Sequence, residues 1–202
     1  MRHIPSFFDR VYKRMRFKKI IIAESIIARE RDRRWVSPGR DVWKINVDAA
    51  FSEKDLGGAW GFVVRDDHSR AVLAGAGRIA VVSDALCAEA HACIEALMVA
   101  ANQGMQHVMV ETDSQILIKA LQTDEFDCAQ GGVLFREAKF LMATMFSSAL
   151  VVHVHRSCNS VAHELAYAGC IKDLDHPAVW VHPLPDFVNA LLVRDSAEAL
   201  VP

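Results

Sequence analysis

Apolar and polar residues alternate in three consecutive runs near the start of the chain, and this alternation predicts three β-strands. In the first run, tryptophan, isoleucine and valine alternate with lysine, asparagine and finally Asp48, a period of two that is typical of a half-buried strand. The second and third runs are joined by a polar turn, as in a hairpin. The runs are VWKINVDAAF (42–51), LGGAWGFVVRDD (56–67) and SRAVLAGAGRIA (69–80).

Helical spacing begins at residue 83 and predicts a helix over 83–104. Ser83 or Asp84 can cap its start and Gly104 can end it. Glu89 falls at the border of its apolar face and not on the opposite, solvent-facing side. The inward stripe is Leu86, Ala90, Cys93, Leu97 and Ala101.

The rest of the pattern alternates strands with helices. Strands are predicted over 107–113 and 149–156, and helices over 114–122, 131–146 and 159–169. Three successive strands favour an antiparallel meander, and helical crossovers favour parallel neighbours. The order βββαβααβα therefore predicts one mixed sheet covered by helices, which is an α/β fold.

The amino-acid composition indicates a globular protein. Of 202 residues, 52% are hydrophobic and 24% are charged, which favours a globular domain over a disordered chain. No apolar run approaches the roughly 18 residues that a membrane span needs, so none is expected. The five cysteines are scattered without a CxxC pair, so the sequence suggests neither a disulfide framework nor a zinc site. We expect an intracellular, reducing compartment, with the nucleus or cytoplasm favoured and an organelle as the alternative.

Charge divides the chain into parts. Residues 1–40 contain twelve Lys and Arg against four Asp and Glu, whereas the remainder contains eleven against 21. We expect 1–40 to be a basic, poorly ordered arm that can also bind a polyanion or an anionic membrane surface. Turn residues at 37–40 mark its boundary, 42–170 is the predicted domain, and 171–202 is predicted to pack on it as a C-terminal extension.

Three carboxylates recur at element ends where metal ligands are expected. Asp48 lies on the first strand, Glu89 in the second turn of the long helix, and Asp113 at the end of VMVETD. If the first and fourth strands are neighbours, these acids can converge, and they would then require a cation. Hard oxygen ligands suit Mg²⁺ or Mn²⁺, and two such ions can promote phosphodiester hydrolysis.

Each acid also has a purely structural interpretation. Asp113 or Ser114 can cap the following helix. Glu89 can provide favourable charge near a helix N-terminus. Asp48 can be a turn residue at a strand end. Only the combination of all three in this element order is specific.

Several ungapped segments in order resemble a known family. The chain resembles the ribonuclease H-like domain that is common in plant proteins and in the reverse transcriptases of plant non-LTR retroelements. The segments are NVDAAF, GGAWGFVVRDD, SDALCAEAHACIEAL, VMVETDSQILIKAL, HVHRSCNSVAHELAYAG and PLPDFVNALLVRD. The resemblance implies a five-stranded mixed sheet of order 3-2-1-4-5, with the first three strands antiparallel and helices flanking it. It also implies metal-dependent cleavage of the RNA strand of RNA–DNA hybrids by Asp48, Glu89 and Asp113.

The chain departs from the family at the fourth ligand. Active members place an aspartate two residues before a Leu-Ala pair, and AHELA has His163 there. Imidazole is a softer, neutral ligand that suits Zn²⁺ or Mn²⁺ better than Mg²⁺, and it can relay a proton. Losing one negative charge should weaken the second ion, so we expect weak activity with His163 as a weak ligand. The alternative is a packed helical histidine without a catalytic role.

The segment before the last predicted helix carries further candidates. Alternation places His153 and His155 on one strand face, where solvated edge residues are the alternative to phosphate contacts. Arg156 and Asn159 are candidate nucleic-acid contacts, and Asn159 can equally cap the helix.

The leading hypothesis is an RNA–DNA hybrid ribonuclease with two Mg²⁺ or Mn²⁺ ions. Such a protein would grip the hybrid through phosphates and 2′-hydroxyls more than through base edges. Two alternatives remain: a module that binds nucleic acid but has lost turnover, and a retroelement-derived fragment whose surface serves protein contacts.

Overall fold

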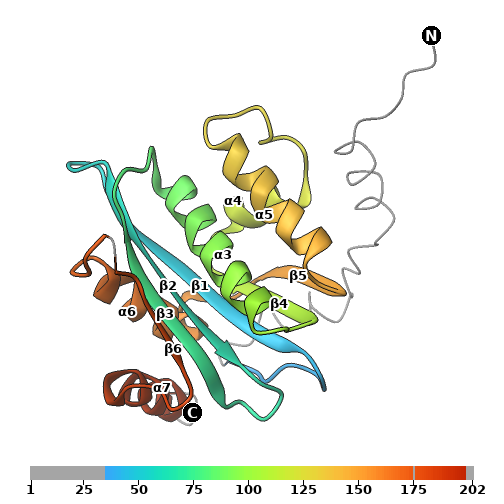
Figure 1. The fold of residues 1–202 in the computed structure, drawn as a ribbon, viewed down its shortest axis with the longest axis vertical. Helices are drawn as coiled ribbons and strands as arrows, with labels where there is room; N and C mark the ends of the chain where they lie inside the picture. The colour runs from blue at the N-terminus through green and yellow to red at the C-terminus, as the bar shows by residue number, and fades with distance from the viewer. Residues whose placement is uncertain (1–34, 175, 199–202) are drawn as a thin grey trace.

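The fold is a single six-stranded sheet with helices on both faces (Figure 1). The computed structural model describes residues 35–174 and 176–198. The expected basic arm, residues 1–40, therefore lies almost entirely outside the described residues.

Five strands follow the predicted order. β1 (Trp43–Ser52), β2 (Gly57–Arg65) and β3 (Ala71–Ile79) pair antiparallel, and β4 (His107–Thr112) and β5 (Ser148–His153) are parallel to β1. This confirms the order 3-2-1-4-5. A sixth strand, β6 (Ala178–Val181), pairs antiparallel with β3 and was not expected. It extends the sheet at the edge that would otherwise end with β3.

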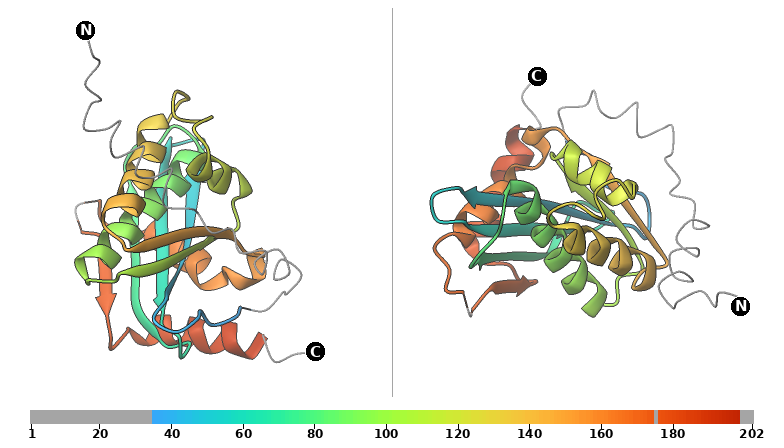
Figure 2. Two further views of the ribbon diagram at one scale, coloured as in Figure 1. Left: turned by 90° about the vertical axis from the view of Figure 1, so that its right-hand side faces the viewer. Right: turned by 90° about the horizontal axis from the view of Figure 1, so that it is seen from above.

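Helices cover the two faces unequally (Figure 2). One face carries α3 (Ala85–Asn102), α4 (Gln115–Gln122) and α5 (Gly132–Thr144). The other carries α6 (Ser160–Gly169) and α7 (Asp186–Glu198), preceded by the short turn η2 (Arg156–Cys158). The ends of α3, α4, α5 and α6 agree with the sequence prediction to within two residues, and α3 and α4 begin at side-chain caps. Asp84 caps α3 by accepting a hydrogen bond from the Cys87 N–H at 2.7 Å.

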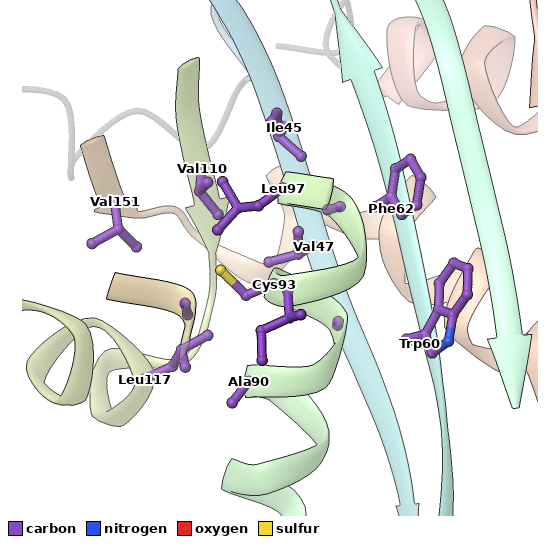
Figure 3. Close-up of a cluster of buried hydrophobic side chains, with 14 of the residues drawn as sticks. Ile45, Val47, Trp60, Phe62, Ala90, Cys93, Leu97, Val110, Leu117 and Val151 are labelled. Atoms are coloured by element: carbon purple, nitrogen blue, oxygen red, sulfur yellow. The ribbon is translucent and has the colours of Figure 1, made fainter. Parts of the chain in front are cut away.

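The larger core lies between α3 and the sheet (Figure 3). Ala90, Cys93 and Leu97 from α3 meet Val47 of β1 and Val110 of β4, as the apolar stripe predicts. A smaller cluster on the opposite face joins α6 and α7 to β2 and β3. Within the described residues, α3 alone has the length and apolar character of a membrane-spanning helix. Half of it is buried inside the protein, as expected for a core helix.

The prediction that β1 is half-buried is wrong. Its polar residues Lys44, Asn46 and Asp48 are only 4%, 1% and 4% exposed. Period two distinguishes the two faces of a strand but does not reveal whether the polar face is covered. Here α6 packs against that face, so the polar residues of β1 form a buried network.

The predicted strand over 149–156 is too long. β5 ends at His153, and His155 begins the turn η2, where its side chain accepts a hydrogen bond from the Ser157 N–H. The two histidines therefore do not share one strand face. Polar side chains at 155–157 form hydrogen bonds with nearby backbone groups. Such local hydrogen bonds compete with strand pairing and favour a turn.

Candidate metal and nucleic-acid site

Two of the three acids lie just beyond the last hydrogen-bonded pair between β1 and β4. That pair is Asn46 with Glu111. Asp48 follows two residues later within β1, and Asp113 follows two residues later just beyond the end of β4, which runs in the same direction as β1. Side chains two residues apart point to the same face, so the two carboxylates emerge together at the C-terminal end of this ladder.

The third acid arrives from the helix above the sheet. α3 packs against β1, and its second turn brings Glu89 to the place where the β1–β4 ladder ends. One ligand oxygen from each of Asp48, Glu89 and Asp113 lies within 4.8 Å of the others. The convergence predicted from the sequence is therefore present.

The structure separates Asp113 from the helix cap that follows it. Ser114 is the N-cap of α4, and its hydroxyl accepts a hydrogen bond from the Leu117 N–H at 3.2 Å. The Asp113 carboxylate takes no part in capping. Of the two interpretations of this Asp-Ser pair, capping thus belongs to Ser114, and Asp113 is left to face the other acids.

Burial and nearby negative charge make two of the acids, Glu89 and Asp48, reluctant to ionise. Burial is the main cause that raises the pKa of Glu89 to about 9, and the charges of Asp48 and Asp113 add to it. Burial also raises the pKa of Asp48, although a hydrogen bond with His163 opposes this effect. Three carboxylates at this spacing, one buried and two partly buried, repel one another unless protons or a cation neutralise them.

The oxygen atoms of these three side chains suit a hard divalent cation as ligands. Oε2 of Glu89 is buried and has no hydrogen-bond partner among the described residues. A buried acceptor without a partner is costly, and a cation would satisfy it. With carboxylate oxygens from Asp48 and Asp113 beside it, the donor set is all oxygen and strongly anionic, the combination that Mg²⁺ and Mn²⁺ favour.

His163 is joined to the acids through Asp48. Its Nδ1 lies 2.7 Å from Oδ2 of Asp48, and the histidine side chain is 46% exposed against 5% for the aspartate. An Nδ1–H that donates to Asp48 leaves Nε2 as an acceptor, 3.4 Å from the Arg156 guanidinium. The structure thus places His163 in the predicted group, as a hydrogen-bond partner of a candidate ligand.

A close approach between α6 and β2 holds His163 in this position. Gly61 pairs across the β1–β2 ladder with Asp48. A Cβ built on Gly61 would lie 2.2 Å from the Ala166 nitrogen and 2.6 Å from the Ala162 oxygen. Only glycine lets the helix backbone come so near the strand.

We expect Gly61→Ala to destabilise the protein by about 3 kcal/mol, because neither backbone can yield without strain. Displacing α6 should also separate His163 from Asp48. Urea unfolding measures the first effect, and the NMR shifts of His163 measure the second. Gly39→Ala is the matched control, since a Cβ there meets nothing within 4 Å. Equal stability of both variants would contradict close packing at Gly61.

Arg156 brings a positive charge to the rim of the site. Its guanidinium lies 3.4 Å from Oδ2 of Asp113 and 3.4 Å from Nε2 of His163, and its side chain is 67% exposed. An exposed arginine beside a candidate metal site can contact a phosphate. Its role as a nucleic-acid contact stays a prediction.

The predictions for Asn159 need correction. Asn159 occupies the N-cap position of α6 but makes no side-chain cap hydrogen bond. Its amide donates to the Val47 carbonyl at 2.9 Å and accepts from Asn46. At 1% exposure it is excluded from direct contact with nucleic acid in this conformation. It joins α6 to β1 instead, because a buried amide must find partners inside the protein.

A buried network beneath the acids was not predicted. Its members are Trp35, Lys44, Asn46, Glu111 and Asn159. The signal was present in the sequence: Asn46 and Glu111 each precede a candidate ligand by two residues, so they share its face. Alternation alone made Asn46 look solvent-exposed.

A second acidic group differs from the first. Asp66, Asp67 and His68 also bring ligand atoms within 4.8 Å of one another. Asp66, however, is paired with Arg70 at 2.7 Å and accepts two backbone hydrogen bonds, and its pKa is lowered. Asp66 in this group, which forms the turn between β2 and β3, is therefore already neutralised and hydrogen-bonded within the turn.

Comparison with solved structures finds ribonucleases H. Ribonuclease H1 from the halophilic archaeon Halobacterium salinarum NRC-1 is 27% identical, with a TM-score of 0.54, and the match covers 63% of this chain and 96% of that one. LC11-RNase H1, whose structure contains an RNA/DNA hybrid, is 19% identical with a TM-score of 0.57, and the match again covers 63% and 96%. The N-terminal ribonuclease H domain of Mycobacterium tuberculosis rv2228c is 22% identical with a TM-score of 0.55, over 64% and 93%.

Comparison with sequences gives the family. No curated protein sequence matches the chain. The family model described as reverse transcriptase-like matches residues 46–169, which span β1 to α6 and contain all three acids and His163. The chain therefore belongs to the reverse transcriptase-like family and carries a ribonuclease H-like α/β domain.

Proposed function

We propose that this protein cleaves the RNA strand of RNA–DNA hybrids with the help of Mg²⁺ or Mn²⁺. The observation that carries the proposal is the convergence of Asp48, Glu89 and Asp113 within 4.8 Å, with one Glu89 oxygen buried and unsatisfied. The likeness to ribonucleases H1, one of them bound to a hybrid, supports the choice of substrate. The hybrid would be gripped through its backbone, as is usual for A-form-like duplexes.

The three carboxylates would hold two divalent ions between the strand ends and α3. When bound, these ions supply Lewis-acid charge and lower the pKa of a water for phosphodiester hydrolysis. His163 would orient Asp48 through the 2.7 Å hydrogen bond. Arg156 is free to exchange its pairing with Asp113 for a substrate phosphate, because that pairing is long and solvent-exposed.

A labelled RNA–DNA hybrid tests the proposal directly. We expect the full chain to cut the RNA strand slowly in Mg²⁺ and faster in Mn²⁺, and to leave DNA duplex intact. Chelation by EDTA should stop cleavage. A chain that binds the hybrid yet never cuts it with either ion would refute the proposed activity.

His163→Asp should increase cleavage supported by Mg²⁺. An added carboxylate beside Asp48 restores negative charge and supplies a harder donor, so the Mg²⁺ concentration for half-maximal rate should fall about tenfold. Titrating the rate with each ion measures this change. His155→Asp adds the same charge on the neighbouring turn, where the side chain contacts only Ser157 among the described residues, and it should have little effect. An unchanged response to both ions would exclude a direct role for His163.

A binding module without turnover is the second candidate function. The observation in its favour is the site itself: an imidazole occupies the fourth ligand position, and Arg156 already neutralises Asp113. Such a module would still bind a hybrid through Arg156 and other cations. The cleavage assay separates the two candidates.

We also infer that the protein works in a reducing, intracellular compartment. All five cysteines are free thiols, and Cys87, Cys93 and Cys158 are buried. Buried free thiols pack as small apolar residues and need no oxidising environment.

A further inference from the structure

Glu111 lies at the centre of the buried network beneath the acids. Its Oε1 pairs with the Lys44 ammonium at 2.5 Å, and the two side chains are only 4% and 5% exposed. Its Oε2 accepts from the Trp35 indole N–H and from the Asn46 amide, each at 3.0 Å. A buried charge pair is tolerated when further hydrogen bonds satisfy its atoms, and both carboxylate oxygens of Glu111 are satisfied in this way.

The three partners of Glu111 all donate hydrogen bonds. Lys44 donates from one side of the carboxylate, and Trp35 and Asn46 donate from the other. A carboxylate accepts on both oxygens, whereas a carboxamide carries one acceptor and one donor. Glutamine at this position would therefore turn its NH₂ group toward a donor in either orientation.

Asn46 extends the network to the helix that carries His163. Its amide nitrogen lies 3.2 Å from Oδ1 of Asn159. The Asn159 amide in turn donates to the Val47 carbonyl at 2.9 Å, and the backbone carbonyl of Asn159 accepts from the His163 N–H at 3.0 Å. The network thus reaches the peptide group that joins Val47 to Asp48 and the first turn of α6.

Three elements that carry site residues are joined through these hydrogen bonds. β1 carries Asp48, β4 leads into Asp113, and α6 carries His163. The β1–β4 ladder has its last pair at Asn46 and Glu111. Beyond that pair the ladder no longer sets the distance between the two aspartates, so the side chains that hold its end together matter most. Groups that orient metal ligands in this way are typically worth 10- to 100-fold in metal affinity.

We propose that Glu111 is a positioning residue for the candidate metal site: through Lys44 and Asn46 it fixes Asp48 and Asp113 relative to each other and thereby sets the affinity of the site for its ion. Glu111 itself contacts neither ion nor substrate in this role, because it is buried and both its oxygens are occupied. The inference rests on the proposed function for the presence of the ion, and it deepens that function.

Mn²⁺ titration of the metal-free full chain tests this role without cleavage. Measured by calorimetry or by EPR of free Mn²⁺, well below the unfolding temperature, Glu111→Gln should weaken Mn²⁺ binding about tenfold. A Glu111→Gln chain that is less stable but binds Mn²⁺ as tightly as the unmodified chain would overturn the inference, because its role would then be structural alone.

Asp127→Asn is the matched control. Asp127 also pairs with a buried lysine, Lys139, at 2.5 Å, but in the loop before α5. The variant should lower the free energy of unfolding, because it takes the charge from the carboxylate closest to a buried ammonium. It should leave the Mn²⁺ dissociation constant unchanged. Equal losses of Mn²⁺ affinity for Asp127→Asn and Glu111→Gln would overturn the inference.

A double variant tests the hydrogen-bond directions themselves. Lys44→Met removes the donor on one side of residue 111, so a glutamine there can turn its NH₂ group to that side. Lys44→Met combined with Glu111→Gln should therefore recover most of the Mn²⁺ affinity that Glu111→Gln loses, whereas additive losses would overturn the inference. Should Glu111→Gln fail to fold, Trp35→Phe removes only the indole N–H, and unchanged Mn²⁺ affinity in that variant would likewise overturn it.

The outcomes separate this inference from the proposed activity. Mn²⁺ binding that depends on Glu111, in a chain that never cuts the hybrid, would reject the activity and keep the positioning role. Hybrid cleavage by a chain whose Mn²⁺ affinity does not depend on Glu111 would keep the activity and reject the role. Mn²⁺ affinity that is unchanged in Asp48→Asn would also overturn the inference, because the ion would then bind elsewhere.

Discussion

Asp48→Asn is expected to abolish hybrid cleavage in both Mg²⁺ and Mn²⁺. Asp48 is the least exposed of the three acids, and its carboxylate interacts with both Glu89 and His163. It would help to hold either ion. Asparagine keeps the shape but removes the charge. Losing a group that stabilises charge in the reaction typically costs about 10²–10³ in rate, and we expect at least that loss here. Single-turnover cleavage of a labelled hybrid measures it.

The chain offers a close control for this change. Asp67 also pairs with a histidine, His68, at 2.7 Å, but it lies in the exposed β2–β3 turn. Asp67→Asn should leave the rate within about twofold, since surface ion pairs contribute little. Comparable losses for both variants would mean that Asp48 matters through general charge and not through the site.

Metal-free stability is expected to fall as pH rises, with Glu89 as the main cause. The pKa of Glu89 is raised from 4.5 to about 9 in the folded state, chiefly by burial. The folded protein therefore holds a proton that the unfolded chain releases. The stabilisation is fully present below pH 4.5 and is lost as pH rises to about 9. The limiting slope for one proton is about 1.4 kcal/mol per pH unit.

Thermal unfolding in EDTA between pH 5.5 and 8.5 checks this slope. For a chain of this size, each kcal/mol corresponds to about 2–4 °C in Tm. Glu89→Gln should flatten the dependence, whereas Glu164→Gln, an exposed glutamate on α6, should leave it unchanged. Adding Mn²⁺ should raise Tm most at high pH, because the metal replaces the proton. A stability that is independent of both pH and Mn²⁺ would argue against a metal site at these acids.

The spacing of apolar and polar residues along the sequence predicted most of the secondary structure. The two-residue alternation of β1, the apolar stripe of α3 and the caps at Asp84 and Ser114 are local features, and each appears in the structure where the sequence predicted it. The six-residue strands β4 and β5 follow from short apolar runs. β6 escaped prediction because four residues between prolines carry too weak a pattern to distinguish a strand from a loop.

The sequence also identified the candidate metal ligands, but it did not show their positions relative to the strand pairing or their hydrogen bonds. Asp48 lies within β1, Glu89 in the second turn of α3 and Asp113 just after β4, and local pattern and family resemblance identify all three. Nothing local shows that the β1–β4 ladder ends two residues before Asp48, or that Glu89 retains an unsatisfied oxygen.

The sequence by itself determined the element order, the inward faces and the three acids, because these depend on neighbours a few residues away. Only the tertiary structure decided that the polar face of β1 is buried, that Asn159 joins α6 to β1, and that Trp35 closes over Asn46 and Glu111. Those contacts join residues 11 to 112 positions apart. Their burial depends on which helix covers which face, and that is a property of the assembled sheet and not of any segment.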